Sequence, residues 1–382
     1  MLTKGALDGV TVLDLSRMLP GPYCSMILAD HGAEVIAMEG RNFQGEGLFF
    51  NDLNRNKKHM TLNLKTEEGV NVFYKLAKNA DVIIEGFRPG VAGRLGIDYQ
   101  SVKRIKDNII YCSITGYGQT GDSCDLAGHD INYLSRSGIL SLIGEKNGAP
   151  TIPGVQFADI AGGSMNAAVG ILLALYARER DGEGQYIDIS MTDGMLGFLT
   201  LPYYFSKKTG QMPPASDTLL SHRYGCYNTY ETADNKFISV GAVESKFWRQ
   251  LCEFLDLQEY TSLQYDDEKR EEIIGRLREI FLKKTQNEWI LLLSEREVCF
   301  TPVQNLKDVL MDSRFREREM VFQKIGRDGE ITYEFGVPVK MSRTPGKLRT
   351  RPEGFGQGTR GTLLELGYSE EQVDQFFEQG IV

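Results

Sequence analysis

Short apolar segments alternate with helix-like segments through the first third of the chain, and this alternation limits the possible folds most strongly. The segments with strand signals are residues 9–15, 33–38, 81–85 and 108–114. Helix signals lie between them, from a turn at 20–22 to about residue 30, over 67–79 behind a Thr66 cap, and over 99–106. Apolar strands that alternate with helices form a parallel sheet covered on both faces. We therefore expect an α/β fold with a large Rossmann-like domain.

The pattern changes in the second half of the chain. A long helix is expected from about residue 159 to 180, with an apolar face that includes Val169, Leu172, Leu173 and Tyr176, and one more strand follows at 185–190. We expect the following organisation: residues 1–190 as the first part of the large domain, 191–221 as a linker, 222–325 as a smaller α+β domain, and 326–382 as a return segment that completes the large domain.

Composition and charge exclude several functions. The 382 residues include 43 Lys and Arg against 52 Asp and Glu, a formal net charge of −9, so we expect no nucleic-acid or acidic-membrane partner. The six cysteines are scattered without a Cys-x-x-Cys pair, and we expect reduced thiols and no metal site. The first 30 residues lack a signal-peptide pattern, and the apolar run 167–177 is about half of a bilayer span. We expect a cytoplasmic protein with no membrane segment.

Nucleotide-binding fingerprints are missing at the place where this fold would carry one. The turn at 16–22 lacks G-x-G-x-x-G, which argues against a nicotinamide enzyme. Basic residues nevertheless fall in or next to loops that follow predicted strands, namely Arg41, Arg55, Lys57, Lys58, Arg88 and Arg94. Such loops gather at the carboxyl edge of the sheet, where ligands bind. The alternatives are a solvated surface and a site for a phosphorylated ligand, and the shared position favours the ligand.

Three titratable residues are candidates for acid–base chemistry. His129 lies in the polar segment 128–133, Asp159 lies at the start of the long helix, and Glu244 lies between a strand and a helix. Each has an ordinary alternative, respectively a structural histidine, a helix N-cap and a first-turn acid. The backbone N–H groups beyond Asp159 could bind an oxyanion, and the glycines at 162 and 163 would allow a ligand to approach closely.

Several motifs together resemble the family III CoA-transferases, over essentially the whole chain. They are residues 7–15, 20–22, 54–58, 62–65, 87–91, 115–118 and 366–369. Within the family, the segments 127–134, 158–159 and 240–244 are most similar to the α-methylacyl-CoA racemase branch. The formyl-type transferases match at Asp159 but have no histidine at the place of His129.

The resemblance implies a role for each candidate residue. Asp159 and His129 would be the two acid–base groups, and Glu244 would be the carboxylate partner of His129, supplied by a neighbouring subunit. The residues that match basic positions of CoA-binding motifs are Arg17, Lys57, Lys58, Arg88 and Arg94. Arg41 follows Gly40, one residue later than the arginine usual in the family. The resemblance further implies an interlocked homodimer and an acyl-CoA substrate, with coenzyme A as part of the thioester and no permanently bound cofactor.

Two mechanisms are compatible with these residues. A racemase removes the proton at the α-carbon of a thioester on one face and returns it on the other, which needs two acid–base groups such as Asp159 and His129. A transferase uses the carboxylate of Asp159 as a nucleophile and carries CoA as an aspartyl thioester. A third alternative is a catalytically silent CoA-binding protein of the same fold. The racemase is the favoured interpretation, because all three acid–base positions carry the expected residue types.

Overall fold

The chain forms two compact units in a computed structural model that describes residues 4–44, 51–325 and 329–382. Unit 1 comprises the residues up to 137, 153–197 and 317–382, and unit 2 comprises residues 138–152 and 198–316. Unit 2 therefore begins and ends earlier than the expected α+β domain at 222–325, and it includes a segment before the long helix. That segment is tied to unit 2 by an ion pair between Lys146 and Asp217, whose Nζ and Oδ2 atoms are 2.7 Å apart.

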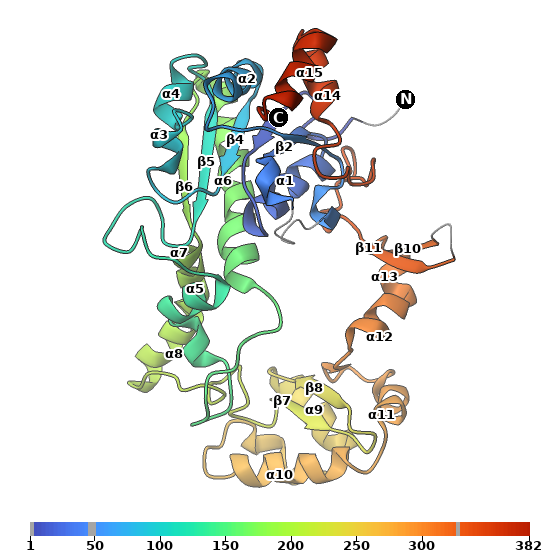
Figure 1. The fold of residues 1–382 in the computed structure, drawn as a ribbon. Helices are drawn as coiled ribbons and strands as arrows, with labels where there is room; N and C mark the ends of the chain where they lie inside the picture. The colour runs from blue at the N-terminus through green and yellow to red at the C-terminus, as the bar shows by residue number, and fades with distance from the viewer. Residues whose placement is uncertain (1–3, 45–50, 326–328) are drawn as a thin grey trace. The chain divides into compact units, whose positions relative to one another are not determined.

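Unit 1 is built on a six-stranded parallel sheet with the order β3-β2-β1-β4-β5-β6 (Figure 1). The strands are β1 (Thr11–Asp14), β2 (Glu34–Glu39), β3 (Lys57–Thr61), β4 (Val82–Glu85), β5 (Ile110–Thr115) and β6 (Tyr186–Ser190). All neighbours pair in parallel. The expected α/β class is confirmed. The sequence missed β3, because its lysines, histidine and threonine do not form an apolar run.

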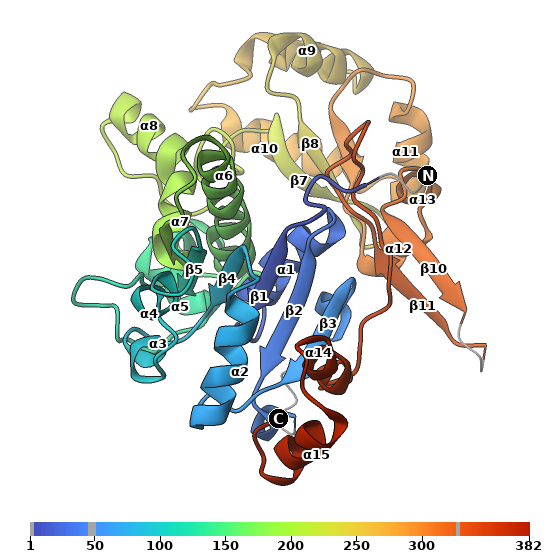
Figure 2. The ribbon, with the colours of Figure 1, turned by 90° about the horizontal axis from the view of Figure 1, so that it is seen from above.

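Helices cover both faces of this sheet. On one face, α2 (Glu67–Ala77), α4 (Tyr99–Lys103), α14 (Thr359–Glu365) and α15 (Glu370–Glu378) share a core with alternate residues of the strands (Figure 2). On the other face, α1 (Pro20–Asp30) and α6 (Asn166–Asp181) contact each other and the strands. The prolines expected in a turn at 20–22 open α1 instead, since the first turn of a helix tolerates proline. Thr66 caps α2 as expected, and its hydroxyl accepts from Gly69 N–H at 3.1 Å.

The C-terminal segment completes unit 1. Gly358 N–H donates to the carbonyl of His59 at 2.8 Å, and Asn63 N–H donates to the carbonyl of Ile381 at 2.7 Å. The last two residues, Ile381 and Val382, are buried in the core beside α2. The remaining elements of unit 1 are α3 (Val91–Arg94), α5 (Asp130–Arg136), α7 (Met191–Leu196), the hairpin β10 (Val321–Ile325) and β11 (Ile331–Phe335), and the 3-10 helices Arg41–Phe43 and Asn51–Asn54.

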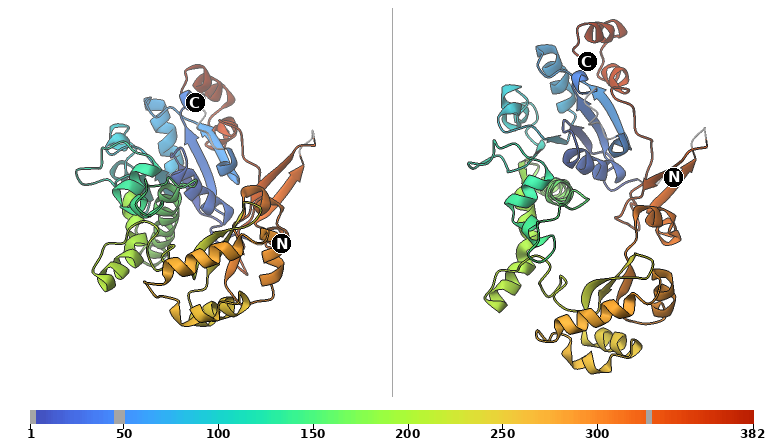
Figure 3. Two further views of the ribbon diagram at one scale, coloured as in Figure 1. Left: turned by 90° about the horizontal axis from the view of Figure 1, so that it is seen from below. Right: turned by 60° about the horizontal axis from the view of Figure 1, so that its bottom comes forward.

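Unit 2 contains a three-stranded antiparallel sheet made of β7 (Tyr227–Glu231), β8 (Phe237–Gly241) and β9 (Phe300–Pro302). The helix α10 (Arg270–Phe281) packs against β7 (Figure 3). The other helices are α8 (Thr200–Thr209), α9 (Ser245–Phe254), α11 (Gln286–Leu293) and α12 (Leu306–Met311), with α13 (Ser313–Glu317) at the end of the unit. Three 3-10 helices span Ile139–Leu142, Gly197–Leu199 and Gln258–Leu263. The expected linker at 191–221 thus contains α7 and α8.

The long helix expected from about residue 159 runs from Ala158 to Asp181, and its first eight residues form a π-helix, Ala158–Met165. Its 24 residues make it the one helix in the described chain that is long and apolar enough to span a membrane, judged by length and composition only. Core helices of proteins outside membranes meet the same criterion. Ile171 and Leu175 are buried in unit 1, whereas the residues expected on its apolar face, Val169, Leu172, Leu173 and Tyr176, are exposed.

Candidate active site

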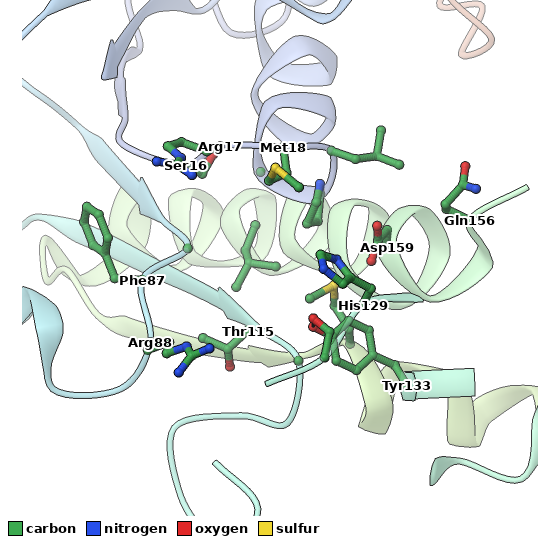
Figure 4. Close-up of a pocket in the computed structure, with 18 of the residues that line it drawn as sticks. Ser16, Arg17, Met18, Phe87, Arg88, Thr115, His129, Tyr133, Gln156 and Asp159 are labelled. Atoms are coloured by element: carbon green, nitrogen blue, oxygen red, sulfur yellow. Dashed lines mark hydrogen bonds between the residues drawn. The ribbon is translucent and has the colours of Figure 1, made fainter. Parts of the chain in front are cut away.

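A cavity of about 940 Å³ opens at the carboxyl ends of β1, β4 and β5 (Figure 4). Its walls come from the loops that follow these strands, residues 16–21, 86–89 and 114–116, and from residues 124–129. In the sheet, β2 and β3 lie on one side of β1, and β4, β5 and β6 lie on the other side. The direction in which the chain adds strands therefore reverses between β1 and β4. Ligands of open α/β sheets bind outside the carboxyl ends of the strands at such a point. The cavity therefore lies where this topology places ligand sites.

The loop after β1 is held by the buried side chain of Asp14. Asp14 Oδ1 accepts from the backbone N–H of Ser16 at 2.9 Å and from the Ser16 hydroxyl, and Oδ2 accepts from the Ser25 hydroxyl. Within this loop Met18 has φ of 68°, a left-handed conformation that favours glycine. Gly21 approaches Ser16 so closely that a Cβ there would lie 1.9 Å from its Oγ. These contacts fix the wall of the cavity in a conformation with local strain.

The loop after β4 is held in a similar way by Glu85. Its Oε2 accepts from Phe87 N–H at 2.6 Å, and its Oε1 accepts from the Ser113 hydroxyl. Burial raises the pKa of Glu85 to about 7, and the negative charge of Asp188 adds to the effect, although both hydrogen bonds oppose it. Arg88 follows on this loop and is exposed at the cavity.

His129 lies at the cavity as the N-cap residue of α5. Its backbone N–H donates to Asn132 Oδ1 at 3.0 Å, which fixes the start of the helix, while its imidazole is exposed. Tyr133, one turn further, is buried and donates from its hydroxyl to the carbonyl of Gly128 at 2.5 Å. Figure 4 shows the His129 ring and the Asp159 carboxylate directed toward the same part of the cavity.

Asp159 lies in the first turn of the π-helix rather than at an N-cap, so the ordinary alternative for this residue is wrong. The helix packs tightly, since a Cβ on Gly194 of α7 would lie 2.5 Å from the carbonyl oxygen of Gly162. Ser164 Oγ donates to the carbonyl oxygens of Pro20 at 2.7 Å and Asp159 at 3.0 Å, and thereby links this helix to the start of α1. Single turns of π-helix occur frequently at functional sites.

The first three amides of this helix are occupied, so of the N–H groups expected beyond Asp159 to bind an oxyanion, that of Ile160 is already bonded. The N–H groups of Ala158 and Asp159 both donate to Asp130 Oδ1, at 2.7 Å and 3.0 Å. Ile160 N–H donates to the carbonyl of Gln156 at 3.1 Å. A second carboxylate, Asp130, thus stands at the helix start.

Burial and, to a smaller extent, the charge of Asp130 raise the pKa of Asp159 to about 6, although His129 opposes both. A carboxyl group with this pKa exists in both protonation states near neutral pH. Groups whose pKa values lie close to the working pH are the most effective general acids and bases. The cavity therefore holds two side chains that can each give or take a proton, and one of them is also a carboxylate that could act as a nucleophile.

Of the predicted basic ligands, the structure brings Arg17 and Arg88 to the cavity, from the loops after β1 and β4. The guanidinium of Arg17 lies over the ring of Phe43, 3.4 Å from its centroid. Arginine at these positions suits phosphate and carboxylate groups.

Lys57 and Lys58 do not lie in a loop at the carboxyl edge, and that expectation is wrong. They open β3 at its amino end, where Lys57 pairs with Val35. The Lys57 ammonium is buried and donates to the carbonyl of Pro22 at 2.8 Å, and it lies 3.8 Å from Asp14 Oδ2. Burial lowers the pKa of Lys57 to about 8, although the charge of Asp14 opposes this. Lys57 therefore belongs to the interior of unit 1.

Lys58 forms ion pairs with Glu34 of β2 and Glu365 of α14, with N–O distances of 3.2 Å and 2.8 Å. These contacts fasten the return segment to the sheet. Neither lysine is among the described residues that line the cavity.

The other arginines singled out in the sequence lie elsewhere in unit 1. Arg94 is exposed at the end of α3 and is not one of the described residues around the cavity. Arg55 binds the buried carboxylate of Asp30, with 2.6 Å between Nη2 and Oδ2. Arg41 donates from Nη1 to the carbonyl of Val382 at 3.2 Å. Arg41 and Arg55 thus hold parts of unit 1 together.

Glu244 lies in unit 2, where it is the exposed N-cap residue of α9. Its backbone carbonyl accepts from the N–H groups of Phe247 and Trp248 at 3.0 Å and 3.1 Å. Its pairing with His129 of another subunit stays a prediction.

The sequence reasoning missed Asp14, Glu85 and Asp130. Asp14 and Glu85 each end an apolar strand segment, and an acidic residue at that place is a signal that could have been used. Asp130 had no such signal, because its partners lie 28 and 29 residues further along the chain. In the described ranges, no three His, Cys, Asp or Glu side chains group as metal ligands. The six cysteines are free thiols.

Comparison with known proteins identifies the family. The family model named CoA-transferase family III matches residues 7–359. The chain is 35% identical to alpha-methylacyl-CoA racemase of Mus musculus over 379 residues, which cover 98% of this chain and 97% of that protein. It is 31% identical to succinyl-CoA:glutarate CoA-transferase of Homo sapiens over 400 residues, which cover 98% and 90%. The crystal structure of a CAIB/BAIF family protein from Brucella suis matches with a TM-score of 0.81 and 28% identity, over 95% of this chain and 100% of that chain. The chain therefore belongs to CoA-transferase family III and is one of the enzymes of that family.

Proposed function

We propose that this enzyme racemises the α-carbon of 2-methylacyl-CoA thioesters by two-base proton transfer through an enolate. The observation that carries the proposal is the placement of Asp159 and His129 around one cavity, where the raised pKa of Asp159, about 6, suits it to acid–base catalysis. One group removes the α-proton, and the other, protonated, returns a proton to the opposite face of the α-carbon. The similarity to the mouse racemase supports the same reaction.

The alternative is a CoA-transferase in which Asp159 attacks the thioester. The 31% identity to the human succinyl-CoA:glutarate CoA-transferase favours this second candidate. A nucleophilic carboxylate must be ionised, and the raised pKa of Asp159 disfavours the ionised form below about pH 6. At neutral pH a group with this pKa is mostly ionised, so either reaction is open to it, and we prefer the racemase because His129 lines the same cavity and can supply the second acid–base group.

In this proposal the CoA part of the substrate binds at the cavity through Arg17 and Arg88. Both lie on loops at the carboxyl edge of the sheet, beside the N-terminus of α1. Guanidinium groups and helix N-termini bind phosphate well. Coenzyme A arrives and leaves as part of the thioester.

We also propose that the active enzyme is an interlocked homodimer in which Glu244 of one chain orients His129 of the other. Support comes from the exposed apolar side chains of α6, which include Leu173 at 64% and Tyr176 at 67% exposure. Contiguous exposed apolar surface of this kind is typical of interfaces. Free cysteines and the net charge of −9 support a cytoplasmic location without nucleic-acid partners.

The test uses one enantiomer of a 2-methylacyl-CoA in heavy water. Racemisation predicts deuterium at the α-carbon and both enantiomers in the product, without transfer of CoA to an added carboxylic acid. Transfer without deuterium uptake would replace the proposal with the alternative.

Two variants separate the mechanisms further. Asp159→Asn keeps the size of the side chain and should abolish turnover by either route. His129→Ala should reduce racemisation on the order of 10²–10⁴-fold, the usual contribution of a positioned acid–base group, whereas a transferase should tolerate the change. Near-wild-type deuterium uptake from both enantiomers in His129→Ala would contradict the two-base reaction.

A further inference from the structure

Asp130 stands between the two candidate acid–base residues. It is the first residue of α5, directly after His129, and its Oδ1 accepts from the backbone N–H of Ala158 at 2.7 Å and of Asp159 at 3.0 Å. The same residue is thus covalently bound to one candidate and hydrogen-bonded to the backbone of the other.

The helix that carries Asp159 has no cap of its own. The residue before it, Phe157, has helical angles of φ −67° and ψ −42° and makes no side-chain capping bond. The first amides of a helix need acceptors from outside the helix, and a carboxylate at that end is favoured by the helix dipole. Asp130 supplies the acceptor for two of these amides from a separate element.

We propose that Asp130 is a positioning residue for the reaction. Its carboxylate fixes the first turn of the helix that carries Asp159 relative to His129, and it places a negative charge beside the Asp159 side chain. Asp130 acts through Asp159 in this proposal and does not exchange a proton with the substrate. The kinetic part of the inference rests on the proposed function, whereas the positioning part depends only on the hydrogen bonds described above.

The surroundings of Asp159 make Asp130 the main source of negative charge acting on it. Asp130 raises the pKa of Asp159, and His129 lowers it. Tyr133 of α5 lies close enough for Asp159 to raise the pKa of its hydroxyl.

Among the described residues, Asp130 and His129 are the charged groups that shift the pKa of Asp159, although α7, which packs against the π-helix, also carries Asp193. At the π-helix glycine Gly163, α1 and α7 present the uncharged residues Pro20 and Met191. Asp188 of β6 is engaged by the backbone N–H of Gln119 at 3.0 Å. Removal of the charge at Asp130 should therefore make Asp159 easier to ionise.

Two substitutions separate the charge of Asp130 from its capping role. Asp130→Asn keeps an oxygen that can accept from both amides but removes the charge. It should retain most of the maximal rate, and the acidic limb of the pH profile of kcat/KM should move to lower pH by on the order of one unit. Asp130→Ala removes both contributions and should lower kcat on the order of 10²-fold, as expected for a displaced catalytic group. Asp122→Asn, an exposed neighbour outside the described cavity lining, is the matched control.

Amide hydrogen exchange of the peptide 157–165 tests the positioning without any reaction. Exchange at the first amides should be faster in Asp130→Ala than in the native enzyme, and Asp130→Asn should keep the protection. Equal protection in all three proteins would overturn the positioning role, whatever reaction the enzyme catalyses. If the pH profile of kcat/KM for Asp130→Asn coincides with that of the native enzyme, the proposed role of the charge is overturned. Where only CoA transfer is observed, the proposed racemisation fails, and the exchange measurement still decides the role of Asp130.

Discussion

Glu85 should make the stability of unit 1 fall as the pH rises toward 7. Its side chain is only 3% exposed and ends β4 beneath the loop that carries Arg88. Burial raises its pKa from an ordinary value of 4.5 to about 7. The unfolded chain therefore releases this proton at a lower pH than the folded chain does.

The magnitude follows from the difference between the two pKa values. Each pH unit over which the folded state alone holds the proton changes the free energy of unfolding by ~1.4 kcal/mol. The interval from 4.5 to about 7 then corresponds to about 3 kcal/mol. This contribution is fully present below pH 4.5 and is lost as the pH rises through 7. A glutamine at this position carries no proton to lose.

The assay compares the native enzyme with Glu85→Gln in urea at pH 4, 6 and 8. The variant should gain about 3 kcal/mol relative to the native enzyme between the lowest and the highest pH. Far-UV circular dichroism follows both units, whereas fluorescence follows unit 2, because Trp248 and Trp289 both lie there. An unfolding transition that circular dichroism detects and fluorescence does not therefore belongs to unit 1.

The matched control is Glu253→Gln, an exposed glutamate on α9 of unit 2. This substitution should leave the pH dependence of unit 1 unchanged. A difference between the native enzyme and Glu85→Gln that stays constant within about 0.5 kcal/mol from pH 4 to pH 8 would refute the reasoning.

Two further predictions concern charges of unit 1. Lys57→Met leaves the buried carboxylate of Asp14 without its cation and should destabilise unit 1 by about 3–5 kcal/mol in urea unfolding, and the double variant with Asp14→Asn should recover most of this loss. A double variant as unstable as Lys57→Met alone would contradict that explanation. Arg88→Gln should weaken binding of coenzyme A about 10- to 100-fold in calorimetry, since a charge-assisted hydrogen bond contributes about 1.5–3 kcal/mol. Lys103→Gln, an exposed residue of α4, is its control, and equal affinities for the two variants would remove Arg88 from the binding site.

Much of the site could be predicted from the sequence because its parts follow strands. The apolar segments that become β1, β4 and β5 predict a parallel sheet, and the loops after them gather at one edge. Asp159 and His129 could be singled out by their place at the start of a helix and in a polar loop. The cavity that both line agrees with that interpretation.

For the long helix, the sequence predicted the range of residues but not the π-helical type of its first eight residues. The apolar composition of 158–181 indicates a helix but not its π-helical start, where Gly162 packs closely against Gly194 of α7. The apolar face expected on this helix, which includes Leu173 and Tyr176, is exposed, because composition alone does not tell which apolar residues a fold buries.

The sequence by itself determined the α/β class, the family and the residue types of the site, because hydrophobic periodicity and short motifs are local properties of the chain. The tertiary structure alone decided which charges meet. Lys57 is buried near Asp14 because β3 pairs with β2 and brings together residues far apart in sequence. Asp130 caps the helix of Asp159 because α5 packs against that helix. Such contacts depend on strand order and helix packing, and the cost of burying an unpaired charge or an unsatisfied amide then fixes them in place.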